Sequence, residues 1–193
     1  MSCGSYPKAT DVTLRLVKLL MQEKRVDEVR RILDIAVRLT PEATRLLELY
    51  AELLADHFDG RLALRYYNRL IALRPNDATY LAWRANIYVK LSLYDLAMRD
   101  YRKANDLADG KAAWIIANIA NLLGNLGFYR DAIGFFNQVL SLRPNAKYAH
   151  ERLAIAIGNR DEEVKKLKTI ETEAGVELAR YSAALSDKKN NPS

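Results

Sequence analysis

The tetrapeptide Leu73-Arg74-Pro75-Asn76 recurs without change as Leu142-Arg143-Pro144-Asn145, 69 residues further on (144 − 75). A third proline, Pro41, precedes the first copy by 34 residues (75 − 41), so the longer interval is twice the shorter one plus one. Each proline follows a stretch whose apolar residues recur at three- and four-residue steps, which predicts amphipathic helices. The proline missing from the series would fall at the turn Asp109-Gly110-Lys111, which also takes the extra residue. A fixed period of this length indicates stacked copies of one small unit.

The composition agrees with a helical protein that buries a core. Half of the 193 residues are apolar, and only eight glycines and five prolines interrupt them. The formal charge of +6 comes from 30 basic and 24 acidic residues, which is mostly a mixed, solvated surface. Cys3 is the only cysteine, so no internal disulfide or thiolate metal cluster can form, and a reducing compartment is expected. The sequence shows neither a secretory signal in Met1–Lys8 nor an apolar run long enough to span a membrane, so we expect a cytoplasmic protein.

Small residues recur at two places in each unit, and aromatic residues recur a few positions after the second place. The small pairs are Ala51 and Ala63, Ala85 and Ala97, and Ala120 with Ala132; the aromatic residues are Tyr67, Tyr101 and Phe136. With the 34-residue period, this pattern resembles the tetratricopeptide-repeat family over about residues 10–158. The resemblance implies a helix–turn–helix unit whose two helices touch at the small residues. It also implies an all-α, right-handed solenoid that binds protein ligands on a concave surface.

The expected boundaries follow from this register. We expect repeats at about 10–43, 44–77, 78–112 and 113–146, and a partial repeat at 147–158. The first repeat is degenerate, because Val17 and Val29 occupy positions that want small residues. Asn159, with Glu162 three residues later, suggests the start of a separate helix over 159–185 that caps the solenoid. Residues 1–9 and 186–193 are expected to be disordered.

The candidate binding face lies on the first helix of the third, fourth and fifth repeats. Several asparagines share one side of these helices, although lysine or glutamate would suit a merely solvated face better. An amide can pair with the backbone of an extended peptide of any sequence, and aromatic or arginine side chains can anchor it. The predicted peptide-binding residues are Trp83, Asn86, Trp114, Asn118, Asn121, Tyr148 and Arg152.

Other interpretations of these residues remain open at this stage. Both tryptophans could pack between adjacent helices, and Asn125, on the same face, could be a turn residue. One subclass of the family holds a terminal carboxylate in a clamp, and Asn86, Asn118 and Arg152 match its pattern. Ala82 and Tyr148 stand where that clamp has lysines, so only the backbone-gripping part of the pattern is carried over. The second repeat instead presents Arg45, Glu48, Glu52 and Asp56, which suits a ligand with a basic end.

The leading function is a protein-interaction adaptor or a dedicated chaperone that binds an extended peptide or a partner protein. Two alternatives are a nucleic-acid-associated protein and a self-assembling structural protein that forms homo-oligomers. Nucleic acid is the less favoured partner, because its basic convex face is accompanied by no recognition motif. That face consists of Arg61, Arg65, Arg69, Arg99, Arg102 and Lys103. We expect no small-molecule substrate, cofactor or metal, and no catalytic residues, because no nucleotide, metalloprotease or hydrolase motif is present.

Overall fold

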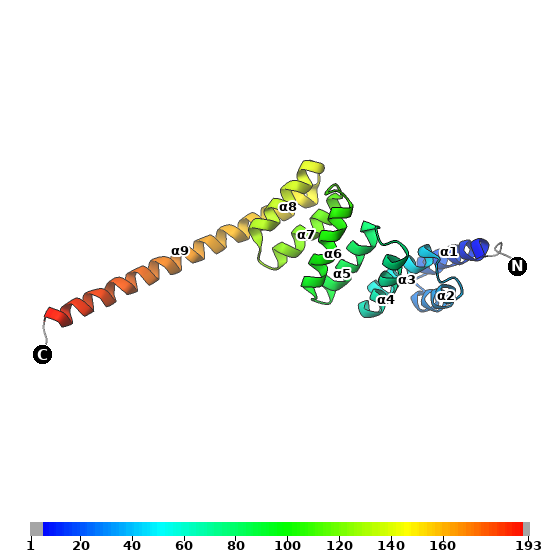
Figure 1. The fold of residues 1–193 in the computed structure, drawn as a ribbon, viewed down its shortest axis with the longest axis horizontal. Helices are drawn as coiled ribbons and strands as arrows, with labels where there is room; N and C mark the ends of the chain where they lie inside the picture. The colour runs from blue at the N-terminus through cyan, green and yellow to red at the C-terminus, as the bar shows by residue number, and fades with distance from the viewer. Residues whose placement is uncertain (1–5, 191–193) are drawn as a thin grey trace. The chain divides into compact units, whose positions relative to one another are not determined.

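The computed structural model describes residues 6–190, with side chains from 9 to 182, and every regular element in that range is an α-helix (Figure 1). The helices are α1 (Tyr6–Gln22), α2 (Val26–Leu39), α3 (Thr44–His57), α4 (Gly60–Leu73), α5 (Ala78–Lys90), α6 (Tyr94–Leu107), α7 (Ala113–Asn125), α8 (Tyr129–Leu142) and α9 (Lys147–Asn190). The predicted all-α solenoid of helical repeats is confirmed. No helix in the described range is long and apolar enough to cross a membrane.

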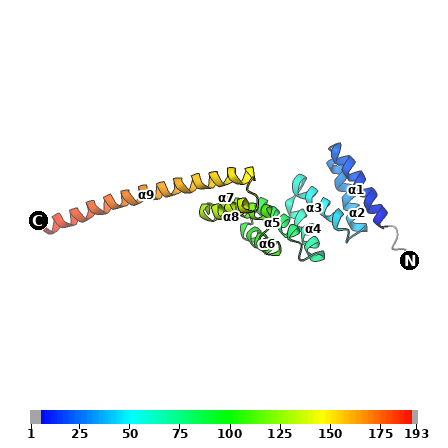
Figure 2. The same cartoon turned by 90° about the horizontal axis from the view of Figure 1, so that it is seen from above.

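The chain divides into two compact units, and the boundary falls inside α7. Unit 1 comprises residues 1–119 and unit 2 comprises residues 120–193. In unit 1, α1 with α2, α3 with α4, and α5 with α6 form successive antiparallel pairs (Figures 1 and 2). In unit 2, α8 packs against the beginning of α9. Each pair of unit 1 is a helix–turn–helix unit, and the second and third pairs begin at Thr44 and Ala78, at the predicted 34-residue period (78 − 44).

Close helix contact within a pair depends on the predicted small residues. Ala51 and Ala63 of the second repeat are fully buried, and so are Ala85 and Ala97 of the third. In unit 2, the equivalent pair Ala120 and Ala132 is also fully buried. Because alanine adds only one carbon atom to the backbone, two helices can approach at these positions without leaving a void. The in-phase alanines are therefore packing residues.

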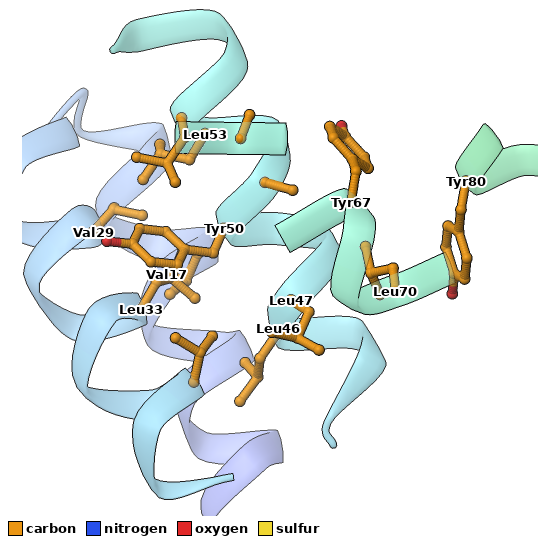
Figure 3. Close-up of a cluster of buried hydrophobic side chains, with 14 of the residues drawn as sticks. Val17, Val29, Leu33, Leu46, Leu47, Tyr50, Leu53, Tyr67, Leu70 and Tyr80 are labelled. Carbon is orange, nitrogen blue, oxygen red and sulfur yellow. The ribbon is translucent and has the colours of Figure 1, made fainter. Parts of the chain in front are cut away.

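The core of the first two repeats is aliphatic with inserted tyrosines. In Figure 3, the ring of Tyr50 from α3 lies beside Val17 of α1 and beside Val29 and Leu33 of α2. Val17 and Val29 are the large residues at positions that want small ones, and both are buried. The first repeat therefore accepts larger side chains and still forms a closed core.

Left-handed backbone residues mark the turns between paired helices at the repeat period. Lys24 (φ 58°) and Ser92 (φ 59°) occupy equivalent turns of the first and third repeats, and Gly127 (φ 87°) occupies that of the fourth. The turn predicted to take the extra residue contains two consecutive left-handed residues, Asp109 and Gly110. Glycine adopts this conformation without the Cβ clash that other residues meet.

A buried ion pair replaces an apolar contact in the third repeat. Arg84 occupies a position that is apolar or aromatic in the other repeats, and it donates to both carboxylate oxygens of Asp100 at 2.6 and 2.9 Å. It also donates to Oδ1 of Asn68 at 2.8 Å, so one guanidinium joins α4, α5 and α6. The Asp100 side chain is 4% exposed and that of Arg84 16% exposed. The carboxylate raises the pKa of Arg84, which therefore stays charged.

The ends of the chain differ from the sequence-based expectation. α1 begins at Tyr6, so residues 6–9 are helical and not disordered, while the rest of the predicted N-terminal tail, 1–5, lies outside the described residues. The predicted C-terminal tail is helical as far as Asn190, and 191–193 lie outside the described residues. In both places the terminal helix continues further than its apolar pattern indicates.

The predicted break at Asn159 is also wrong, because α9 runs unbroken from Lys147 to Asn190. An N-cap contributes only about 1 kcal/mol, whereas a break would leave four carbonyls and four N–H groups without helical partners. The second part of α9 does not act as the expected cap either. Among residues 161–182, only Val164 is partly buried, and all the others are exposed.

Candidate functional site

Unit 1 contains a groove of about 470 Å³ between the first helices of neighbouring repeats. It is lined from α3, α4, α5 and the beginning of α7 by Glu52, Ala55, Asp56, Tyr67, Trp83, Asn86, Ile87, Lys90 and Asn118. Three of the predicted peptide-binding residues, Trp83, Asn86 and Asn118, therefore lie together.

The two asparagines of the groove are joined to each other and to a buried tyrosine. Oδ1 of Asn86 accepts from the hydroxyl of Tyr101 and from Nδ2 of Asn118, the latter at 3.2 Å. These bonds orient both amides, because a carbonyl oxygen has to face the two donors. Among the described residues, Nδ2 of Asn86 and Oδ1 of Asn118 have no hydrogen-bond partner. The groove thus presents one oriented donor group and one oriented acceptor.

Aromatic rings form the apolar part of the groove. Trp83 is partly buried and packs edge-on against Tyr67, with 6.3 Å between ring centroids. It also packs against Tyr80 in a tilted arrangement, with 6.0 Å between centroids. Trp83 packs on the core, as one of its two open interpretations expects, and it also lines the groove. Tyr67 was assigned only to the core by its place in the repeat, so sequence reasoning missed it as a groove residue.

The α3 side of the groove is acidic. Burial raises the pKa of Tyr67 well above its usual range, and the nearby carboxylates of Glu52, Asp56 and Glu48 raise it further. Glu48 is already engaged, since it accepts from the hydroxyl of Tyr80 at 2.6 Å and from Arg45 at 3.0 Å. Glu52 is exposed and has no ion-pair partner within the described chain. Glu52 is therefore the carboxylate of the groove that is available to a cation.

An ion pair crosses the groove from α5 to α3. Nζ of Lys90 lies 3.1 Å from Oδ1 of Asp56 and donates to the carbonyl of Ala55 at 3.2 Å. Both charged side chains are more than half exposed, so the pair adds little to stability. Its effect is local, because it neutralises Asp56 and leaves Glu52 as the free carboxylate.

Three other predicted residues form a separate polar network in unit 2. Oδ1 of Asn121 accepts from Nε of Arg152 at 2.9 Å, and its Nδ2 donates to the hydroxyl of Tyr148. Nη2 of Arg152 also donates to Oδ1 of Asn125, at 3.4 Å, so Asn125 helps to hold the guanidinium. Arg152, Asn125 and apolar residues of α7, α8 and α9 line a hollow of about 80 Å³. The amide of Asn121 is thus satisfied inside the protein.

The remaining expected features are placed less centrally. Trp114 is 42% exposed on α7 and lines neither hollow. Ala82 and Ala117, which the repeat register also places on the predicted face, are buried. On the basic face, Asp95 and Asp106 line the same shallow surface of α6 as the basic residues, so positive charge is interrupted there. The described residues contain no group of three or more potential metal ligands.

Comparison with known proteins identifies the repeat. A family model described as tetratricopeptide repeat matches residues 78–110. Serine/threonine-protein phosphatase T from Aspergillus oryzae (strain ATCC 42149 / RIB 40) is 29% identical over 150 residues, which is 76% of this chain. The match spans only 29% of the length of that relative.

Solved structures share the architecture at low sequence identity. MamA 41-end from Desulfovibrio magneticus RS-1 superposes with a TM-score of 0.70 at 16% identity, covering 92% of this chain and 98% of that one. PilF from Pseudomonas aeruginosa superposes with a TM-score of 0.68 at 17% identity, covering 82% of this chain and 72% of that one. YrrB, described as a TPR protein with an unusual peptide-binding site, gives 0.60 at 14% identity and covers 83% and 86%. The matched repeat at 78–110, the repeat period and the buried alanine pairs show that the chain is built from tetratricopeptide repeats, and the solved structures share its fold.

Proposed function

We propose that this chain is a protein-interaction module, an adaptor or a dedicated chaperone, that holds an extended segment of a partner protein in the groove of unit 1. The observation that carries the proposal is the oriented pair of amides, Asn86 and Asn118. Their remaining donor and acceptor match the alternating C=O and N–H groups of an extended backbone. A relative of the same fold, YrrB, is described as having a peptide-binding site. We assign no reaction to the chain and propose that it acts in the cytoplasm, as its single cysteine suits.

The groove favours a peptide with a basic side chain. Trp83 and Tyr67 offer an apolar and aromatic surface, and aromatic side chains are common anchors of binding energy. Glu52 is the carboxylate that remains after Lys90 has neutralised Asp56. A lysine or arginine of the ligand could pair with Glu52 while its aliphatic stem covers the Trp83 ring.

The test is a peptide-binding measurement on purified protein with Trp83 as reporter. The chain has two tryptophans, so Trp114→Phe leaves Trp83 as the only one. Peptides selected from a random display library on this variant are then titrated while Trp83 fluorescence is recorded. We expect the selected peptides to be rich in lysine or arginine and to change that signal on binding.

Matched substitutions locate the site. Asn118→Ala should weaken binding about 5- to 10-fold, since a hydrogen bond contributes about 1 kcal/mol. Glu52→Gln should weaken basic peptides and reduce the salt dependence of their affinity. Asn76→Ala and Glu42→Gln change exposed residues of inter-repeat turns and serve as controls. Equal affinity for all four variants and the parent protein would show that the peptide binds elsewhere.

A further inference from the structure

The second half of α9 carries apolar side chains that no part of the described chain covers. Leu167 and Ile170 are 54% and 60% exposed, and Leu178 and Tyr181 are 71% and 70% exposed. A helix of a globular protein normally packs its apolar stripe against a neighbouring element. Here α8 packs only against the beginning of α9, and residues 165–182 are all exposed.

These side chains follow the spacing of a coiled coil. Steps of three and four residues alternate through Val164, Leu167, Glu171, Ala174, Leu178 and Tyr181. An average step of 3.5 residues keeps a narrow seam facing one partner helix of the same kind. Glu171 is the only charged residue in this series, which we call the α9 seam.

The α9 seam continues a face that is already a packing face. Ile157, seven residues before Val164, is partly buried in unit 2, and Ala149 and Ala156 beside this line are buried. Leu153 is partly buried there, and Leu167 follows it by two seven-residue steps. The same side of one continuous helix is thus covered in its first part and uncovered in its second part.

We propose that the α9 seam pairs with the α9 seam of a second copy of this chain, in antiparallel orientation, to form a homodimer. The pairing that carries the fewest conflicts sets residues opposite each other whose numbers sum to 345. Its layers are Val164 with Tyr181, Leu167 with Leu178, and Glu171 with Ala174, each occurring twice.

Charge selects the antiparallel arrangement. In a parallel, in-register pair every seam residue meets its own copy, so Glu171 would face Glu171 in the centre of the seam. Arg160, one step before Val164, would likewise face Arg160. Like charges directly opposite each other oppose association, and the parallel pair gains only the flanking contact of Glu163 with Lys168 of the other copy. In the antiparallel pair Glu171 faces the small Ala174, and its carboxylate can reach solvent past that methyl group.

The first test measures mass in solution. Light scattering coupled to gel filtration should give about twice the chain mass of 22.0 kDa at high protein concentration. The double variant Leu167→Lys/Leu178→Lys should return the protein to the monomer. Val176→Lys is the matched control, because Val176 is 49% exposed on the opposite side of α9, and it should stay dimeric. All of these side chains are exposed, so the helical repeats should unfold at an unchanged temperature.

The second test determines orientation by disulfide trapping in a Cys3→Ser background. A mixture of Leu167→Cys and Leu178→Cys chains should form a mixed disulfide, because these positions face each other in the antiparallel pair. Leu178→Cys alone should not cross-link. The two copies of that residue would be displaced by 11 positions (178 − 167), about 16 Å at 1.5 Å per residue, beyond the reach of a disulfide.

Three outcomes would overturn the proposal. A monomer at every concentration shows that the α9 seam has another occupant. A dimer that survives Leu167→Lys/Leu178→Lys shows that association uses another surface. Efficient cross-linking of Leu178→Cys alone shows a parallel pair. Each readout concerns mass or cross-linking and is independent of peptide binding in the groove of unit 1.

Discussion

The buried pair of Arg84 and Asp100 allows the sharpest prediction about stability. Replacing Asp100 with Asn keeps the shape of the side chain but leaves the guanidinium of Arg84 facing a neutral amide. Removing one member of a buried pair costs about 3 to 5 kcal/mol. Arg84 is 16% exposed and retains Asn68 as a partner, so we expect the lower end, about 3 kcal/mol.

The double variant distinguishes a paired charge from a simple packing loss. Arg84→Met/Asp100→Leu removes both charges and keeps similar volume, so it should be near the parent in stability or slightly above it. Urea unfolding followed by circular dichroism measures Asp100→Asn, the double variant and its two single components, Arg84→Met and Asp100→Leu. The slope of the unfolding free energy against urea should stay unchanged, because repeat arrays can unfold in steps. If Asp100→Asn costs less than about 1 kcal/mol, or if the double variant loses the sum of the single losses, the reasoning is refuted.

Three further outcomes are expected. Burial raises the pKa of Tyr101 to about 12, so above pH 10 the unfolded chain releases this proton first. The free energy of unfolding should therefore be highest below pH 10 and should fall as the pH rises towards 12. Urea midpoints measured across this pH window should show the fall, and Tyr101→Phe should make it smaller. Asn86→Ala should lower the free energy of unfolding by about 1 to 3 kcal/mol, because it leaves the buried Tyr101 hydroxyl without its acceptor. Asn118→Ala should lower it by less than about 0.5 kcal/mol. Equal losses in urea unfolding would contradict the hydrogen bonds described. Ser92→Gly should raise the unfolding temperature slightly, because relief of left-handed strain of about 1 to 2 kcal/mol exceeds the entropy cost of glycine, whereas Ser92→Ala should give no such gain.

Periodic features could be predicted well from the sequence. The 34-residue spacing of the prolines, the alanine pairs and the amphipathic stretches together predicted the helical hairpins and their stacking. These features are readable because each one depends on neighbours within a repeat, and the repeat occurs several times. Even the turn at Asp109 and Gly110 followed from one additional residue in the period.

Partner choice among polar side chains could be predicted only in part. The pattern grouped Asn118 and Asn121 on one face, but the structure bonds Asn118 to Asn86, which also accepts from Tyr101, while Asn121 bonds to Tyr148 and Arg152. Residues three apart on a helix point in similar directions, yet the group each one meets belongs to another helix. Which group each residue meets is therefore decided by how the helices pack.

The length of α9 shows the same division between local and tertiary information. Asn159 and the residues after it form a good local signal for a helix start, and the apolar pattern of the sequence changes at this point. The sequence therefore favours a break. Continuing the helix preserves all of its backbone hydrogen bonds, and nothing in the fold requires the chain to turn back. The sequence alone therefore determined the repeat, the helices and the residues that pack them. Only the tertiary structure decided which amides remain open to a ligand, because that depends on contacts between helices. It also decided that the last helix runs unbroken past Asn159, because no contact with another element turns the chain back.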